Sequence, residues 1–151
     1  MKKFTFSLDR VLEFRRSQAR IEEVKLEHLY AERAAIDLRE RTLREEHRQT
    51  LALSVRQGEQ AGGISGEELA ALDRFGHHML TEFRRCAQSR ASCAQRMAAQ
   101  LQAVAAKRRD VKLLERLKHQ GRTAWDREFE REIAQSAEEA HLAKWIRENI
   151  Q

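Results

Sequence analysis

The chain has 151 residues, which is enough for one domain of ordinary size, and it contains no proline. Charged residues make up 35% of the sequence and aromatic residues only 6%, while Ala, Leu, Glu, Arg and Gln dominate. This composition is typical of long helices and coiled coils, and it excludes a sheet protein because β-branched and aromatic residues are scarce. We therefore expect a single all-α domain over residues 1–151.

The charge is mixed, with a formal net value of +5, so nucleic-acid binding is permitted but not required. The two cysteines, Cys86 and Cys93, would lie about 10 Å apart along one helix, too far for a disulfide. The first residues lack the apolar run of a signal peptide, and no stretch reaches the roughly 20 apolar residues of a membrane span. These features predict an intracellular, cytoplasmic protein in a reducing compartment.

A first helix is predicted over about residues 8–57, with Ser7 as its N-cap. Its apolar residues recur at steps of three, four or seven, the spacing of a buried stripe, at Leu8, Leu12, Ala19, Leu26, Leu29, Ile36 and Leu43. Four positions of the same stripe carry charges instead, namely Arg15, Glu22, Arg33 and Glu40. The stripe is therefore apolar but incomplete.

A glycine-rich turn is predicted at residues 58–66, because four of the six glycines fall there. Ser65 and Glu68 then form a capping box that opens a second helix over about residues 66–148. The predicted seam of this helix has heptad spacing, at Leu69, Leu72, Met79, Phe83, Cys86, Cys93, Met97, Val104, Val111 and Leu114.

Two long helices joined by one turn predict an antiparallel coiled-coil hairpin, because neither helix can leave its apolar stripe in water. With the turn centred near Gly62, residue 62+k faces residue 62−k, which places Met97 near Glu27 and Leu114 near Arg10. Residues after about Lys118 have no partner in this hairpin, so we expect an overhanging C-terminal helical segment.

The second helix contains a basic run between Phe83 and Arg109, with seven Lys or Arg residues and no acid. The opposing part of the first helix carries the acids Glu22, Glu23, Glu27, Glu32, Asp37 and Glu40. One interpretation is that the two runs pair within the hairpin and set its register. The other is that the basic run binds nucleic acid, although it contains a single aromatic residue, Phe83.

No enzyme motif is present, since the sequence has no phosphate-binding loop, no HExxH motif and no nucleophile elbow. His77, His78 and Cys86 do not have the spacing of a metal-ligand set. We therefore expect a protein that is not an enzyme and has no cofactor or metal.

The overhang carries apolar residues at near-helical spacing, at Trp125, Phe129, Ile133, Ala137 and Ala140, with Trp145 and Ile146 beyond them. These residues could pack on a bend of the chain or in a homodimer. Alternatively, they could form a surface that docks inside another protein.

Two stretches resemble the FliJ family of flagellar type III export proteins. FTFSLDRVLEFR, residues 4–15, is similar to that family's opening pattern F-x-F-x-L-x-x-V-L-x-x-R. VKLLERLK, residues 111–118, followed by Trp125, Glu128 and the pair Glu138-Glu139, is similar to its C-terminal L-E-x-L-K segment and acidic pair.

The resemblance implies a non-enzymatic stalk, similar to the γ stalk of rotary ATPases, held in the pore of the hexameric flagellar export ATPase. It also implies contacts with the cytoplasmic domain of the export gate and with export chaperones, at the inner face of the cell membrane and without direct membrane binding. By analogy with γ, the end with both termini enters the ATPase ring, through Phe4, Phe6, Leu8, Leu12, Leu117, Trp125 and Phe129. Phe75 and Met79, near the turn, would face the gate.

Two alternatives to this function stay open. A stalk of a virulence-type secretion system has a related architecture. A basic coiled coil could also bind nucleic acid or organise another assembly, and in that case no secretion component would be its partner.

Overall fold

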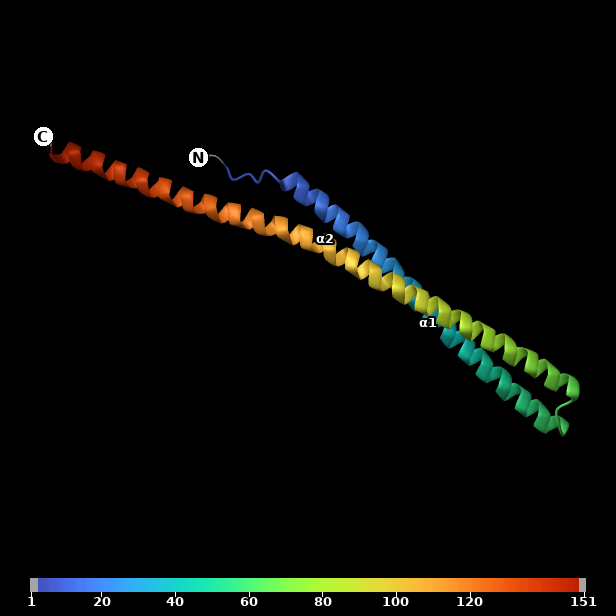
Figure 1. Cartoon of the computed structure of the whole chain (residues 1–151). Helices are drawn as coiled ribbons and strands as arrows, with labels where there is room; N and C mark the ends of the chain where they lie inside the picture. The colour runs from blue at the N-terminus through green and yellow to red at the C-terminus, as the bar shows by residue number, and fades with distance from the viewer. Residues whose placement is uncertain (1–2, 150–151) are drawn as a thin grey trace. The chain divides into compact units, whose positions relative to one another are not determined.

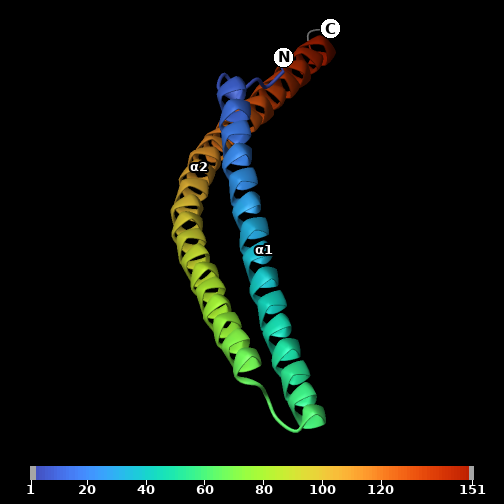
Figure 2. The same ribbon diagram turned by 90° about the vertical axis from the view of Figure 1, so that its right-hand side faces the viewer.

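The computed structural model describes residues 3–149, which form two helices, α1 (Asp9–Ala61) and α2 (Gly66–Asn149). Figures 1 and 2 show the helices running in opposite directions from the short connection between them. Residues 3–149 contain no strand, so the predicted all-α hairpin is confirmed. Neither helix has a segment that is both long and apolar enough to cross a membrane, within the residues described.

The chain divides into two compact units, each built from a part of both helices. Unit 1 combines the chain up to Arg20 with the chain from Ala105 onward, and unit 2 comprises Ile21–Val104. The two units are described separately below.

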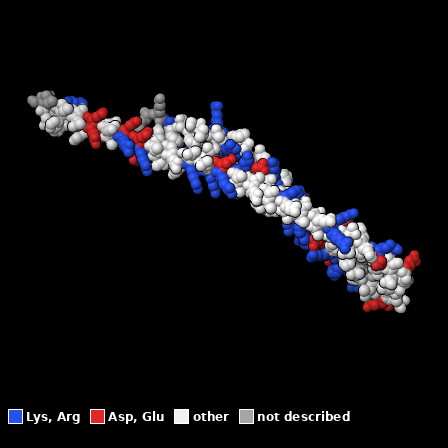
Figure 3. All heavy atoms as spheres, viewed as in Figure 1, with Lys and Arg blue, Asp and Glu red and all other residues white. Residues whose placement is uncertain are grey.

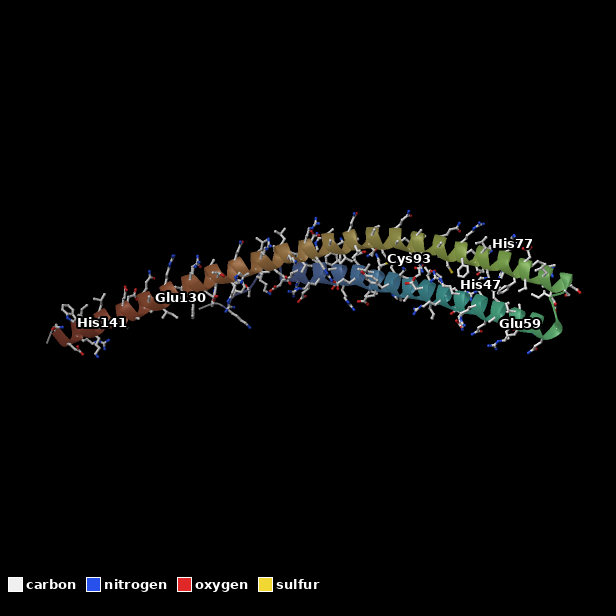
Figure 4. The ribbon with its side chains drawn as sticks, turned by 90° about the horizontal axis from the view of Figure 1, so that it is seen from below. His47, Glu59, His77, Cys93, Glu130 and His141 are labelled. Carbon is white, nitrogen blue, oxygen red and sulfur yellow. The ribbon has the colours of Figure 1, made fainter. Side chains whose placement is uncertain are left out.

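The core of unit 2 is a narrow seam between α1 and α2. Leu43, Met79 and Cys86 form its buried cluster, with Phe75 and Phe83 packed against it. Further along α2, Cys93 is fully buried and its thiol points at the Leu29 carbonyl at 3.6 Å; Figure 4 shows it between the helices. The predicted heptad positions therefore form the contact between the helices.

The predicted register is approximate: several contacts between the helices lie within four residues of it, but Arg90–Glu40 and Arg16–Glu115 lie six and seven residues away. Arg96 was expected opposite residue 28 and is paired with Glu32, while Cys93, expected opposite residue 31, meets Leu29. In unit 1, Lys118 was expected opposite residue 6 and donates to Asp9 at 2.6 Å. For the Arg and Lys contacts, long side chains that lean along the helices account for the offsets.

Charged residues occupy the seam where the sequence placed them: Arg15, Glu22, Arg33 and Glu40 are all half-buried. Three of them have partners on α2: Arg15 lies 3.5 Å from Asp110, Glu22 accepts a hydrogen bond from Gln100 at 2.6 Å, and Glu40 accepts one from Arg90. Polar layers of this kind favour one register over others, because any shift would leave a half-buried charge without its partner.

The first helix differs from its predicted bounds at both ends. Its first hydrogen bond runs from Leu12 N to the Leu8 carbonyl, which gives the N-cap position to Leu8 instead of Ser7. At the other end α1 continues to Ala61 instead of about residue 57. Gly62 adopts a φ of 76° and Gly63 N donates to the Gly58 carbonyl at 2.8 Å, which is a Schellman cap.

The start of α2 confirms the capping box. Glu68 N donates to the Ser65 hydroxyl at 3.2 Å, and Ser65 N donates to the Glu68 carboxylate at 2.8 Å. These bonds from Ser65 lower the pKa of Glu68. Leu69, in contrast, was predicted in the seam and is exposed. Thr50, Ser54, Gln57 and Gly58 of α1 line a cavity of about 280 Å³ that Leu72, and not Leu69, borders from α2.

Candidate partner-binding surfaces

Unit 1 contains an aromatic cluster that joins the N-terminal segment to α2. The Phe4 ring lies 6.3 Å from the Trp125 ring, and Trp125 stacks on Phe129 at 5.1 Å with an interplanar angle of 12°. All three rings are half-buried, so the cluster is anchored in unit 1 and still presents apolar surface to water. We call Phe4, Trp125 and Phe129 the N-terminal aromatic cluster.

Arg122 and Gly121 complete this cluster. The Arg122 guanidinium lies 5.5 Å from the Phe4 ring centre and 5.1 Å from the Trp125 ring centre, within cation–π range, and Asp126 accepts from it at 3.0 Å. A Cβ at Gly121 would lie 3.7 Å from Phe4, so the ring packs directly over the glycine. The packed part of α2 therefore extends beyond Lys118, which corrects the predicted start of the overhang.

The other residues predicted to meet an ATPase lie around this cluster at different depths. Phe6 is half-buried, and Leu8 and Leu117 are exposed. Leu12 is only 1% exposed and belongs to the core of unit 1, so it supports the helix pair and has no surface to offer a partner. Sequence patterning groups these residues, but only the folded chain separates core from surface.

The residues predicted to face an export gate lie in the core of unit 2. Met79 is buried against Leu43, and Phe75 is half-buried with its ring stacked on His47 at 6.0 Å. The His47 ring also meets Phe83 edge-on at 6.5 Å. Of the two predicted residues, only Phe75 retains surface that a partner could reach.

The basic run of α2 finds acidic partners on α1 at its centre. Arg90 donates to Asp37 at 2.8 Å and to Glu40, and Arg96 donates to Glu32 at 3.0 Å. The hydrogen bond from Arg90 lowers the pKa of Asp37, and the bond from Arg96 lowers the pKa of Glu32. The interpretation of the run as an internal charge partner is therefore confirmed for Arg90 and Arg96.

The last part of α2 is a single exposed helix. Every residue from Glu130 to Asn149 is exposed, including Ile133, Leu142, Trp145 and Ile146. Figure 4 shows Glu130 and His141 on this segment, which has no second helix beside it. We call residues 130–149 the C-terminal overhang. An isolated helix of this length is marginal in water, so the segment is suited to a partner.

Within residues 3–149, no group of three or more His, Cys, Asp or Glu side chains is arranged to hold a metal ion. Both cysteines are free thiols and buried. The roles of Arg122, Gly121 and His47 were not predicted from sequence. Arg122 and Gly121 could have been found only through the contact between Phe4 and Trp125. That contact depends on the non-helical segment before α1, whose path the heptad pattern does not describe.

No protein-family model, curated protein or solved structure matches the chain.

Proposed function

We propose that this protein is a non-enzymatic stalk or adaptor of the flagellar type III protein export apparatus. In this proposal it couples the hexameric export ATPase to the export gate and to export chaperones during assembly of the flagellum. It acts in the cytoplasm, at the inner face of the cell membrane, and reaches the membrane only through the export apparatus.

One observation supports this proposal most directly: the contact between Phe4 and Trp125. Phe4 opens the N-terminal stretch that resembles the FliJ family, and Trp125 follows the C-terminal one. The fold brings the two stretches together in unit 1 and leaves their aromatic rings partly accessible. In the proposal, this N-terminal aromatic cluster is the part that enters the ATPase ring.

A stalk of this kind acts mechanically. Because α1 and α2 are continuous helices paired by apolar and charged seam layers, force applied to one helix is shared by its partner. Hydrolysis belongs to the ATPase in this scheme. The exposed part of Phe75 and the cavity beside Leu72 are where the gate would bind.

Binding to a purified flagellar export ATPase from the protein's own host tests the proposal. The paired substitution Trp125→Ala/Phe129→Ala should weaken binding by at least about tenfold, since buried aromatic anchors dominate interface energies. Tyr30→Ala is the matched control, because Tyr30 is an exposed aromatic residue of unit 2. Absence of binding by the wild-type protein, or equal binding by the paired variant, would contradict the proposal.

A second candidate function is nucleic-acid binding by the outer face of α2. Arg109, Lys112 and Arg116 of unit 1 are exposed, and no ion pair involving them occurs within residues 3–149. Replacing Arg109, Lys112 and Arg116 with Glu should abolish retention on a DNA duplex and remove its salt dependence under this reading. Under the export proposal, the same change should leave ATPase binding intact.

A further inference from the structure

The C-terminal part of α2 carries a second face that the aromatic cluster does not use. Leu113 and Leu117 stand at one end of this face, and Leu142, Trp145 and Ile146 stand at the other. All five are exposed, by between 42% and 60%. On a helix with 3.6 residues per turn, they fall within a sector about 100° wide, together with Ala124, Glu128, Arg131 and Gln135.

This face is separate from the seam that packs on α1. The seam side of α2 carries Leu114, Lys118 and Trp125, which contact or approach the N-terminal part of the chain. Each of them is offset from Leu117 by about 60° or more around the helix axis. The face therefore lies on the flank of unit 1, where it remains open to a partner.

The order of residues along this face is self-complementary. When two copies are placed antiparallel so that paired residue numbers add to 259, Leu113 meets Ile146 of the other copy and Leu117 meets Leu142. In the same register Glu128 meets Arg131 of the other copy, and Ala124 meets Gln135. Apolar residues therefore meet apolar residues at both ends, and opposite charges meet at the centre.

The central charges are free to make this contact. Glu128 and Arg131 are exposed, and neither has an ion pair within residues 3–149. Figure 3 shows acidic and basic side chains close together along the C-terminal segment of α2. Because the pairing is reciprocal, the same Glu128–Arg131 contact would occur twice, once on each side of a two-fold axis.

α1 adds apolar surface beside one end of the face. Val11 and Phe14 are exposed, and Arg15 next to them lies 3.5 Å from Asp110, one turn before Leu113. This ion pair brings the flank of α1 alongside Leu113. The C-terminal end of a second copy would therefore contact both α1 and α2, through its residues Leu142, Trp145 and Ile146.

We propose that two copies of the chain associate antiparallel through this face of α2, and that each copy covers the C-terminal overhang of the other. The overhang then gains the apolar partner that a single helix in water needs. This inference goes beyond the proposed function and is independent of it, because it concerns the purified protein alone.

Sedimentation equilibrium of the full-length protein over a wide concentration range tests the association. We expect a reversible dimer, and we expect Leu142→Ala/Ile146→Ala to weaken it by at least about tenfold. Leu53→Ala is the matched control, because Leu53 is similarly exposed but belongs to unit 2. A wild-type protein that stays monomeric, or a dimer unaffected by the paired substitution, would overturn the proposal.

Charge reversal tests the register without depending on apolar residues. Glu128→Arg and Arg131→Glu should each weaken the dimer, because each places like charges opposite one another twice. An equimolar mixture of the two variants should associate again. The Glu128→Arg variant carries two positive charges at the centre of the face and the Arg131→Glu variant carries two negative ones, so opposite charges meet in the mixed dimer. Circular dichroism of each variant separates this result from loss of helix. A mixture that remains as weak as its components would refute the register.

Discussion

One helix, α2, has two very different environments along its length. Between Met79 and Val104 it contributes four buried residues to the seam of unit 2, whereas from Glu130 to Asn149 every residue is exposed. Both parts are rich in Ala and contain neither Gly nor Pro, so helix propensity favours a helix in both. Helix propensity therefore favours the helix in both regions, but only in the seam is the helix also stabilised by burial of apolar side chains.

The largest expected effect comes from the buried side of this comparison. Leu43→Ala should lower the free energy of unfolding by about 2–5 kcal/mol, because Leu43 is 1% exposed and packed against Met79 and Cys86. Ile133→Ala in the overhang should change it by less than about 0.5 kcal/mol. Urea denaturation followed by circular dichroism measures both variants. Similar losses for the two variants would mean that the overhang is packed as tightly as the seam.

The N-terminal aromatic cluster marks the boundary between the covered and uncovered parts of α2. Phe4→Ala should cost about 1–2 kcal/mol in local stability, because a half-buried ring loses its contacts with Trp125 and Gly121. The tryptophan emission should shift to longer wavelength as Trp125 becomes wetter. The variant Trp125→Phe leaves Trp145 as the only tryptophan, so its emission gives the constant contribution of Trp145. An unchanged spectrum would show that Phe4 does not cover Trp125 in solution.

Glycine substitutions should act in opposite directions at the cluster and at the turn. Gly121→Ala should stabilise the protein by up to about 1 kcal/mol, because the helix tolerates the Cβ and Phe4 lies at ordinary contact distance from it. Gly62→Ala should destabilise it by about 1 kcal/mol, because its φ of 76° is unfavourable for residues with a Cβ. Thermal denaturation compares the two. A gain at Gly62 would contradict the Schellman cap.

The smallest expected effect is that of acid on the ion pairs of unit 2. Hydrogen bonds from Arg48 and then Gln49 lower the pKa of Glu45 from 4.5 to about 2, and Arg90 lowers that of Asp37. Because these pKa values are lower in the folded state, the stabilisation is complete above the unfolded values and is lost as the pH falls. For Glu45 the loss lies between about pH 4.5 and 2.

NMR titration of the carboxylates measures these pKa values directly. Arg90→Gln should return the pKa of Asp37 toward its ordinary value and leave that of Glu45 unchanged, because Glu45 is held by Arg48 and Gln49. If the pKa of Asp37 did not respond, Arg90 would not be its principal partner in solution.

The sequence by itself determined the features that depend on neighbours in the chain. These include the two helices, the turn, the capping box of Ser65 and Glu68, and the heptad positions that include Arg15 and Glu40. Each follows from spacing along one helix or from a local hydrogen bond, which a sequence pattern records.

The tertiary structure decided what depends on packing between segments. It determined that Leu12 and Met79 are core while Leu69 is exposed, since burial depends on what the other helix places opposite each residue. It also placed Phe4 over Gly121 and Trp125, because a non-helical segment has no periodicity from which its path could be predicted. The end of α1 at Ala61 is a local feature, but composition alone could not place it, because four nearby glycines each permit a cap and the Gly63–Gly58 hydrogen bond selects one.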